Sequence, residues 1–137
     1  MTNQEAFTRM VTHLRHQGRK SVHPKLPHQL QMFAYRAPTG ERCPVGVLIT
    51  DEFYTPALEG YTITTPFVQH MLDEALPGVS FDLLWVMQCI HDMDPPTAWE
   101  SSWTKVARDV RWSLKMPPIV VDALTVSTVE EVTSALA

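Results

Sequence analysis

One apolar stretch near the middle of the chain, FDLLWVMQCIH at residues 81–91, predicts the centre of the fold. Its apolar side chains cover nearly the whole circumference of a helix, which is typical of a helix buried on all sides. The stretch follows a serine cap at Ser80 and ends before the proline pair Pro95-Pro96. Truncating Trp85 to alanine should then cost about 3–5 kcal/mol. We expect three large side chains of this helix in the core: Leu84, Trp85 and Ile90.

Amphipathic helices are expected on both sides of this centre. The first spans residues 2–18, where a capping box opens the helix, apolar residues recur every three or four positions, and a glycine closes it. The second spans residues 65–76 and begins with a favourable Thr-Pro pair. The third spans residues 97–116 and ends at another proline pair. A last helix is expected from residue 127.

A β-hairpin is expected between the first helix and the centre. Two short extended runs, residues 32–36 and 42–43, flank a turn-forming Pro-Thr-Gly-Glu sequence at residues 38–41. The apolar run that follows, residues 43–49, is too short for its periodicity to distinguish a strand from a helix, so both remain open. The predicted fold class is α+β, with four to five helices packed around a short β-hairpin.

The length and composition predict one globular domain over residues 1–137, with residues 117–137 forming a short strand-helix tail. No apolar run approaches the ~18 residues needed to cross a bilayer, and no signal peptide is readable, so a cytoplasmic protein without membrane contact is expected. In that compartment Cys43 and Cys89 should both be reduced, buried and slow to react.

Charge is distributed unevenly along the chain. The net charge is −4, but residues 1–42 hold seven Lys or Arg against two acids, and residues 44–104 hold nine acids and no Lys or Arg. Acids on the polar faces of the expected helices should form a negative surface that attracts a protein with a basic surface, such as a host nucleic-acid-binding protein. The residues expected to contact such a partner are Asp73, Glu74 and Asp82.

Direct nucleic-acid binding is not expected. Basic residues gather near the amino terminus, but aromatic residues that could stack on bases do not alternate with them. The net negative charge also disfavours a general nucleic-acid binder. An alternative to the exposed acidic surface also remains open: the basic residues 1–42 and the acidic residues 44–104 would then pair with each other within the fold.

A second hypothesis places chemistry at the end of the central helix. His91 stands beside Asp92, a combination suited to acid-base catalysis, and Cys43 would be a nucleophile if His91 packed against it. His91, Asp92 and Asp94 would alternatively bind a divalent cation. Each residue also has a structural interpretation, because aspartates organise turns and cysteines fill cores. No cofactor signature is present, so no cofactor is expected.

The chain resembles a group of small uncharacterised proteins from phages, prophages and bacteria. The resemblance lies in a segment of the form Y-R-x-P-x-G-x-x-C-x-x-G-x-L, here residues 35–48, and in a later His-Asp or Asn-Asp pair, here His91-Asp92. It covers residues 1 to about 114. Pro44 departs from the small residue that is usual in the group, and this puts a helix starting at Cys43 in question. The small residues of the segment, every third position from Gly40 to Gly46, suggest close packing against the central helix.

Taken together, these features favour a non-enzymatic accessory protein. The resemblance implies a phage or prophage protein that binds a host or phage protein, and the uneven charge suggests binding through an acidic face. The alternative is a small enzyme or a ligand- or metal-binding domain that uses His91, Asp92 and Cys43.

Overall fold

The computed structural model describes residues 1–23, 33–121 and 124–126. Five α-helices and two strands lie in these ranges, together with two short 3-10 helices. In chain order they are α1 (Asn3–Gln17), α2 (Pro44–Leu48), η1 (Pro56–Leu58), α3 (Pro66–Ala75), α4 (Phe81–Met93), η2 (Pro96–Ala98), α5 (Trp99–Arg108), β1 (Ile119–Val121) and β2 (Leu124–Val126).

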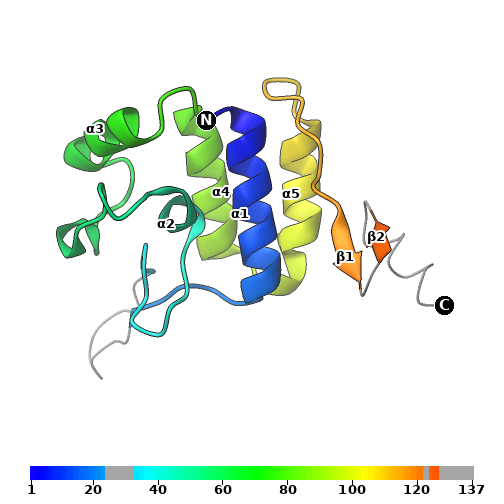
Figure 1. Ribbon diagram of the computed structural model, residues 1–137, viewed down its shortest axis with the longest axis horizontal. Coiled ribbons are helices and arrows are strands. Elements are labelled where there is room, and N and C mark those ends of the chain that lie inside the picture. Colours follow the sequence, from blue (N-terminus) through cyan, green and yellow to red (C-terminus); the bar gives the residue numbers. More distant parts are fainter. Residues whose placement is uncertain (24–32, 122–123, 127–137) are drawn as a thin grey trace.

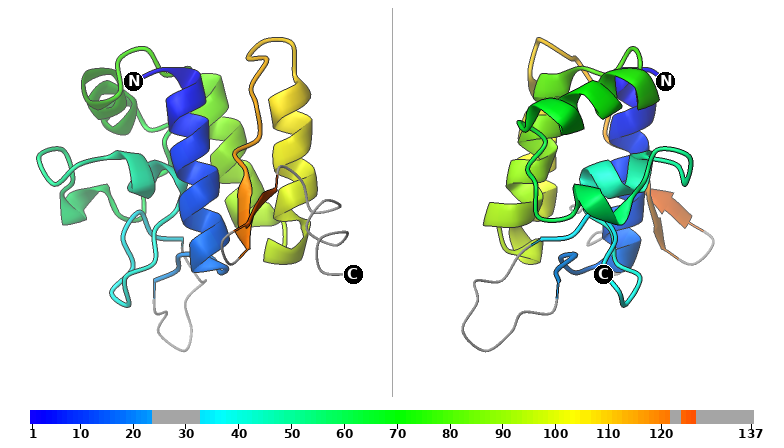
Figure 2. Two further views of the ribbon diagram at one scale, coloured as in Figure 1. Left: turned by 45° about the vertical axis from the view of Figure 1, so that its right-hand side comes forward. Right: turned by 90° about the vertical axis from the view of Figure 1, so that its left-hand side faces the viewer.

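Three helices, α1, α4 and α5, run alongside one another and form the body of the molecule (Figure 1). The short helix α2 packs against both α1 and α4, and α3 extends to the side of this body (Figure 2). A partly buried ion pair supports the arrangement, because Arg15 on α1 donates to the carboxylate of Glu100 on α5. The hydrophobic core lies between these helices.

Helix α1 forms as its sequence predicts. The Thr2 hydroxyl accepts from the Glu5 amide, the Glu5 carboxylate accepts from the Thr2 amide, and Gly18 ends the helix at φ 69°. These contacts satisfy backbone groups that a bare helix end leaves without partners. The apolar face is fully buried and consists of Ala6, Phe7, Met10, Val11 and Leu14.

The predicted β-hairpin is wrong, and with it the α+β fold class. Residues 33–43 form a loop with two isolated bridges, one between Arg36 and Arg42 and one from Phe33 to Val22. The Glu59 carboxylate accepts the amide hydrogens of Tyr35 and Arg36, so these donors are not available to a neighbouring strand. The described core is helical. The strands that the structure does describe, β1 and β2, pair antiparallel at the edge of the helical body (Figure 1).

The apolar run 43–49, for which the sequence left both strand and helix open, contains the helix α2. Pro44 occupies the first turn of α2, where its missing amide hydrogen costs nothing, so a proline at this position does not prevent the helix. Gly46 lies against the backbone of Tyr35, and a Cβ at this position would come within 1.9 Å of the Tyr35 carbonyl oxygen. At Gly46 the close approach is therefore to the Tyr35 backbone, while α2 as a whole also packs against α4.

The central helix is buried on one side only. Leu84 and Ile90 are buried as expected, but Trp85 is 42% exposed, which contradicts its expected place in the core. The helices α2 and α5 cover other faces of α4, and the core tryptophans are instead Trp99 and Trp103 on α5. The apolar composition of residues 81–91 therefore reflects an exposed apolar surface as well as a core.

The expected helix over residues 97–116 ends early, at Arg108. The Asp109 carbonyl accepts from the amides of Trp112 and Ser113, and this turn leaves Val110 89% exposed. β1 coincides with the short strand expected before the carboxyl terminus, whereas the helix expected from residue 127 lies outside the described residues. None of the described helices is long and apolar enough to cross a membrane.

Candidate functional site

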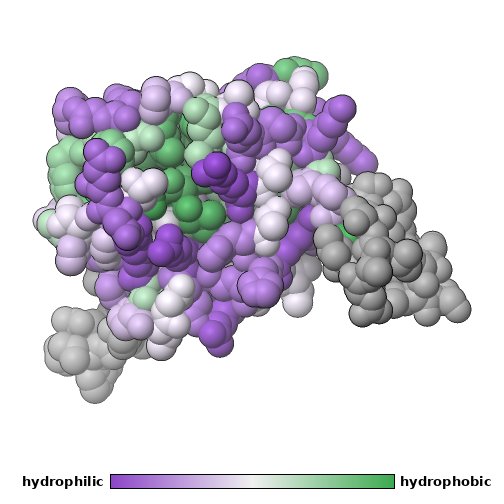
Figure 3. Space-filling model, in the orientation of Figure 1, coloured by the Kyte–Doolittle hydropathy of each residue, from purple (hydrophilic) through white to green (hydrophobic). Residues whose placement is uncertain are grey.

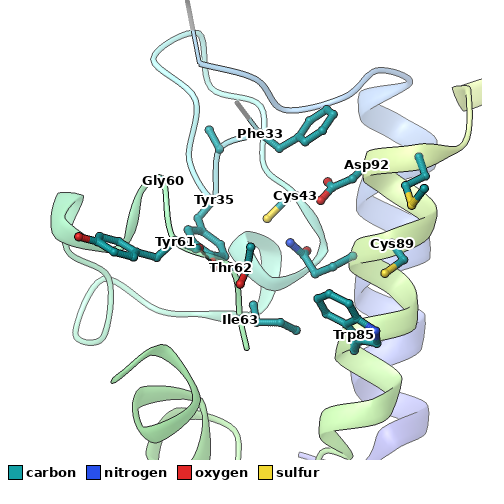
Figure 4. Close-up of a pocket in the computed structure, with 13 residues that line it drawn as sticks. Phe33, Tyr35, Cys43, Gly60, Tyr61, Thr62, Ile63, Trp85, Cys89 and Asp92 are labelled. Atoms are coloured by element: carbon teal, nitrogen blue, oxygen red, sulfur yellow. Dashed lines mark hydrogen bonds between the residues drawn. The ribbon is translucent and has the colours of Figure 1, made fainter. Parts of the chain in front are cut away.

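An apolar pocket of about 350 Å³ opens on the side of α4 that carries Trp85. We call it the Trp85 groove. Hydrophobic residues are exposed in a hollow on this face, in the region of α2, α3 and α4 (Figure 3). Figure 4 shows the lining, which comes from three parts of the chain: residues 33–35 with Cys43, residues 60–63, and the exposed side of α4.

One wall of the groove is a line of residues along α4. They recur every three or four positions and therefore lie on one face of the helix. The line begins and ends near a carboxylate, and its apolar members Trp85 and Met93 are 42% and 79% exposed. We call this line the α4 stripe: Asp82, Trp85, Cys89, Asp92 and Met93, of which all but Asp82 line the pocket.

The opposite wall is the irregular segment 60–63, toward which Trp85 projects (Figure 4). Tyr61 is 52% exposed and packs edge-on against Phe67 of α3, with ring centroids 5.1 Å apart. This continues the apolar surface beyond the pocket onto α3. A hydrogen bond fixes this segment to Tyr35, whose hydroxyl donates to the Tyr61 carbonyl at 2.5 Å.

Glu59 anchors this wall to the rest of the molecule. Its carboxylate accepts three hydrogen bonds, from the amides of Tyr35 and Arg36 at 2.9 and 3.0 Å and from the Tyr54 hydroxyl at 2.7 Å. The residues of the Y-R-x-P-x-G segment are therefore used to build the wall of the groove. Sequence reasoning missed this role of Glu59, because the residues that its carboxylate binds are 5 to 24 positions away along the chain.

The two thiols that line the groove are not activated. Burial raises the pKa of Cys43 to about 12, and burial also raises the pKa of Cys89, although Cys89 is partly exposed. A thiol with a raised pKa carries almost no thiolate near neutral pH. Both cysteines are free, and the groove therefore holds no prepared nucleophile.

His91 faces the interior on another side of α4. Its Nε2 accepts the Ser21 amide hydrogen at 3.0 Å, and its Nδ1 therefore carries the proton and donates to the Asp92 carboxylate at 2.7 Å. The ring also stacks on Trp99, with centroids 5.7 Å apart. Of the three residues of the catalytic hypothesis, Cys43 and Asp92 line the groove and His91 does not.

The metal hypothesis lacks an assembled set of ligands. The Asp94 carboxylate accepts from the Ser102 hydroxyl at 2.6 Å, while His91 and Asp92 bind each other. Throughout the part of the chain that the structure describes, no three His, Cys, Asp or Glu side chains gather closely enough to hold a metal ion.

The expected partner-binding acids lie on the helices beside the groove. Asp73 and Glu74 are exposed on α3, and Asp82 is exposed in the first turn of α4. Within the described ranges none of the three lies within 4 Å of a Lys or Arg, although Glu74 contacts His70. Other acids do pair with the basic front of the chain: Arg15 with Glu100, Arg19 with Glu41 and Arg36 with Asp51.

Three polar side chains that line the groove already have partners. The Tyr35 hydroxyl binds the Tyr61 carbonyl, the Gln88 carboxamide oxygen accepts from the Val45 amide, and the Asp92 carboxylate accepts from His91. Small-molecule sites usually contain a few polar groups that converge on the ligand. This arrangement instead suits contact with an apolar surface.

Comparison of the chain with family models, with curated proteins and with solved structures found no match.

Proposed function

We propose that this chain is a non-enzymatic binding protein that contacts a protein partner through the Trp85 groove and the acids beside it. The observation that carries the proposal is Trp85, a large aromatic side chain that is 42% exposed in an apolar pocket. Exposed tryptophans in such hollows are common anchors of protein interfaces. Soluble proteins seldom expose connected apolar surface of this kind without a use for it.

The charge around the groove indicates the kind of partner. Asp73, Glu74 and Asp82 are exposed on the two helices that border it, and the sequence from residue 44 to 104 contains no Lys or Arg. A negative surface attracts a basic one and speeds its association. We therefore propose a partner with a basic surface, such as a nucleic-acid-binding protein of the host.

The biological setting follows from the resemblance of residues 35–48 and His91-Asp92 to phage and prophage proteins. We propose an accessory protein that acts in the cytoplasm of a bacterial host, on a host or phage protein. The enzymatic alternative has less support, because Cys43 is buried with a raised pKa and both ring nitrogens of His91 are occupied.

The test is capture of bacterial proteins on the immobilised full chain after nuclease treatment. Wild-type protein should retain a partner in stoichiometric amount, and Trp85→Ala should lose it. Val110→Ala is the matched control, because Val110 is an exposed apolar residue outside the groove. Equal retention by the wild type and Trp85→Ala would contradict the proposal.

A second pair of variants separates the acidic face from the net charge. Asp73→Asn/Glu74→Gln removes two negative charges beside the groove, and Thr12→Lys/Ser101→Lys adds two positive charges at exposed sites on α1 and α5. Both raise the net charge by two. Only the first pair should weaken capture; an equal loss in both would contradict a local acidic contact.

A further inference from the structure

We propose that the Trp85 groove receives a short amphipathic α-helix of the partner, with an apolar face flanked by Lys or Arg. This inference rests on the proposed function and specifies which element of the partner is bound. It follows from three properties of the groove: the geometry of the α4 stripe, the lack of backbone partners in its walls, and the charges at its ends.

The α4 stripe has the side-chain pattern that one helix contributes to a helix-helix contact. Asp82, Trp85, Cys89 and Asp92 follow one another at three- and four-residue intervals, and Met93 lies four residues after Cys89. From Asp82 to Met93 the stripe covers about 16 Å of helix at 1.5 Å per residue. Such rows form the ridges that pack into the grooves of a second helix. The corresponding faces of α4 toward α2 and α5 are occupied, and among the described elements no helix packs along the stripe.

The walls of the groove favour a helix over an extended peptide. A bound strand needs a sheet edge whose amide and carbonyl groups pair with its own. The wall opposite α4, residues 60–63, belongs to no strand in the described structure, and the Tyr61 carbonyl is already bound by Tyr35. A helix satisfies its backbone internally, so it can lie on apolar walls without leaving polar groups unpaired.

The charges suggest where the basic residues of the partner helix lie. Asp82 is exposed at one end of the stripe and Asp92 is partly exposed at the other. Two cations near these ends already have partners: Lys20 donates to the Asp92 carbonyl at 2.9 Å, and Arg111, which interacts electrostatically with Asp82, is paired with Asp109. The carboxylates are about 15 Å apart along the helix, so basic residues 10 or 11 positions apart would face them.

The experiment uses a fluorescein-labelled peptide, KLLKLLLKLLKLLLKLLK, and the full chain, with anisotropy as the readout. Two matched peptides accompany it, one with every Lys replaced by Glu and one with a central Leu replaced by Pro. The basic helix should bind, and Trp85→Ala should weaken its binding by about tenfold, as is usual for a central aromatic anchor. Val110→Ala should leave the affinity unchanged.

Each other outcome overturns the inference. Equal binding of the acidic peptide would show that charge complementarity does not determine binding. Equal binding of the proline peptide would indicate an extended occupant. Loss of self-association in Trp85→Ala, seen by sedimentation of a dimeric wild type, would make a second copy the occupant. If Trp85-dependent capture of a partner succeeds while the basic peptide fails to bind, the helix inference fails and the proposed function stands.

Discussion

Tryptophan occupies contrasting environments in this protein. Trp103 is 1% exposed and Trp99 is 2% exposed, whereas Trp85 is 42% exposed beside the groove. A buried aromatic side chain contributes to stability through the apolar area that it removes from water. The same side chain at the surface contributes to binding, because part of its area is still available to a partner.

The first prediction compares two of these side chains. Trp103→Ala should lower the free energy of unfolding by about 3–5 kcal/mol, because it leaves a cavity in the core. Trp85→Ala should lower it by roughly 1 kcal/mol or less, since surface substitutions away from special features have small effects. Urea denaturation of both variants measures the difference. An equally large loss for Trp85→Ala would place Trp85 in the core after all.

The second prediction concerns the two thiols. Cys43 is 1% exposed, and burial raises its pKa to about 12, so a thiol reagent near neutral pH finds neither access nor thiolate. Cys89 is partly exposed and should react first. Mass spectrometry after timed alkylation of the folded protein resolves the two sites. Labelling of Cys43 should become faster as the pH rises, and rapid labelling near pH 7 would revive the nucleophile hypothesis.

At the level of elements, the loop 33–43 and the helix α2 form one packed unit. Gly46 brings α2 against the Tyr35 backbone, Glu59 holds the amides of Tyr35 and Arg36, and Gln88 ties α4 to Val45. None of these contacts belongs to a helix or sheet ladder. They are nevertheless what places the wall of the groove opposite α4.

The third prediction tests this unit through two glycines. Gly46→Ala should destabilise the protein by about 3 kcal/mol, because its Cβ would overlap a backbone oxygen that cannot move aside freely. Gly18→Ala meets no neighbouring atom within 4 Å and should cost only about 1–2 kcal/mol, for its left-handed φ of 69°. Thermal unfolding monitored by circular dichroism compares the two. The reverse order would show that α2 does not approach Tyr35 closely.

At the scale of the whole molecule, the uneven charge of the chain is partly neutralised within the fold. Two arginines of the basic front pair with acids of the middle, Arg15 with Glu100 and Arg36 with Asp51, whereas Arg19 pairs with Glu41 of the front itself. The acids on α3 and at the start of α4 stay outside these pairs. The internal pairing and the exposed acidic face, which the sequence left as alternatives, therefore coexist in different regions.

The fourth prediction follows from this charge distribution. Asp73→Lys/Glu74→Lys should slow association with the basic partner more than it speeds dissociation, because exposed charges act mainly on diffusional encounter. Binding of the wild type should weaken with salt, since the Debye length falls to about 8 Å near physiological ionic strength. Surface plasmon resonance at several salt concentrations measures both rates. If neither salt nor the reversal matters, the acids only keep the protein in solution.

Local patterns by themselves determined three of the described helices. Capping residues, prolines and apolar periodicity located α1, α3 and α4, because the interactions that start and stop a helix lie within a few residues of its ends. The exposure of Asp73, Glu74 and Asp82 followed in the same way from the polar face of each helix.

Tertiary structure decided the rest. The hairpin failed because Glu59, more than 20 residues away, accepts the amides of Tyr35 and Arg36. Trp85 became a surface residue because α2 and α5 cover other faces of α4, and helical periodicity cannot tell an apolar face that is packed from one that is left open. The groove itself depends on which distant segments pack opposite α4, and the spacing of residues along the chain does not predict that packing.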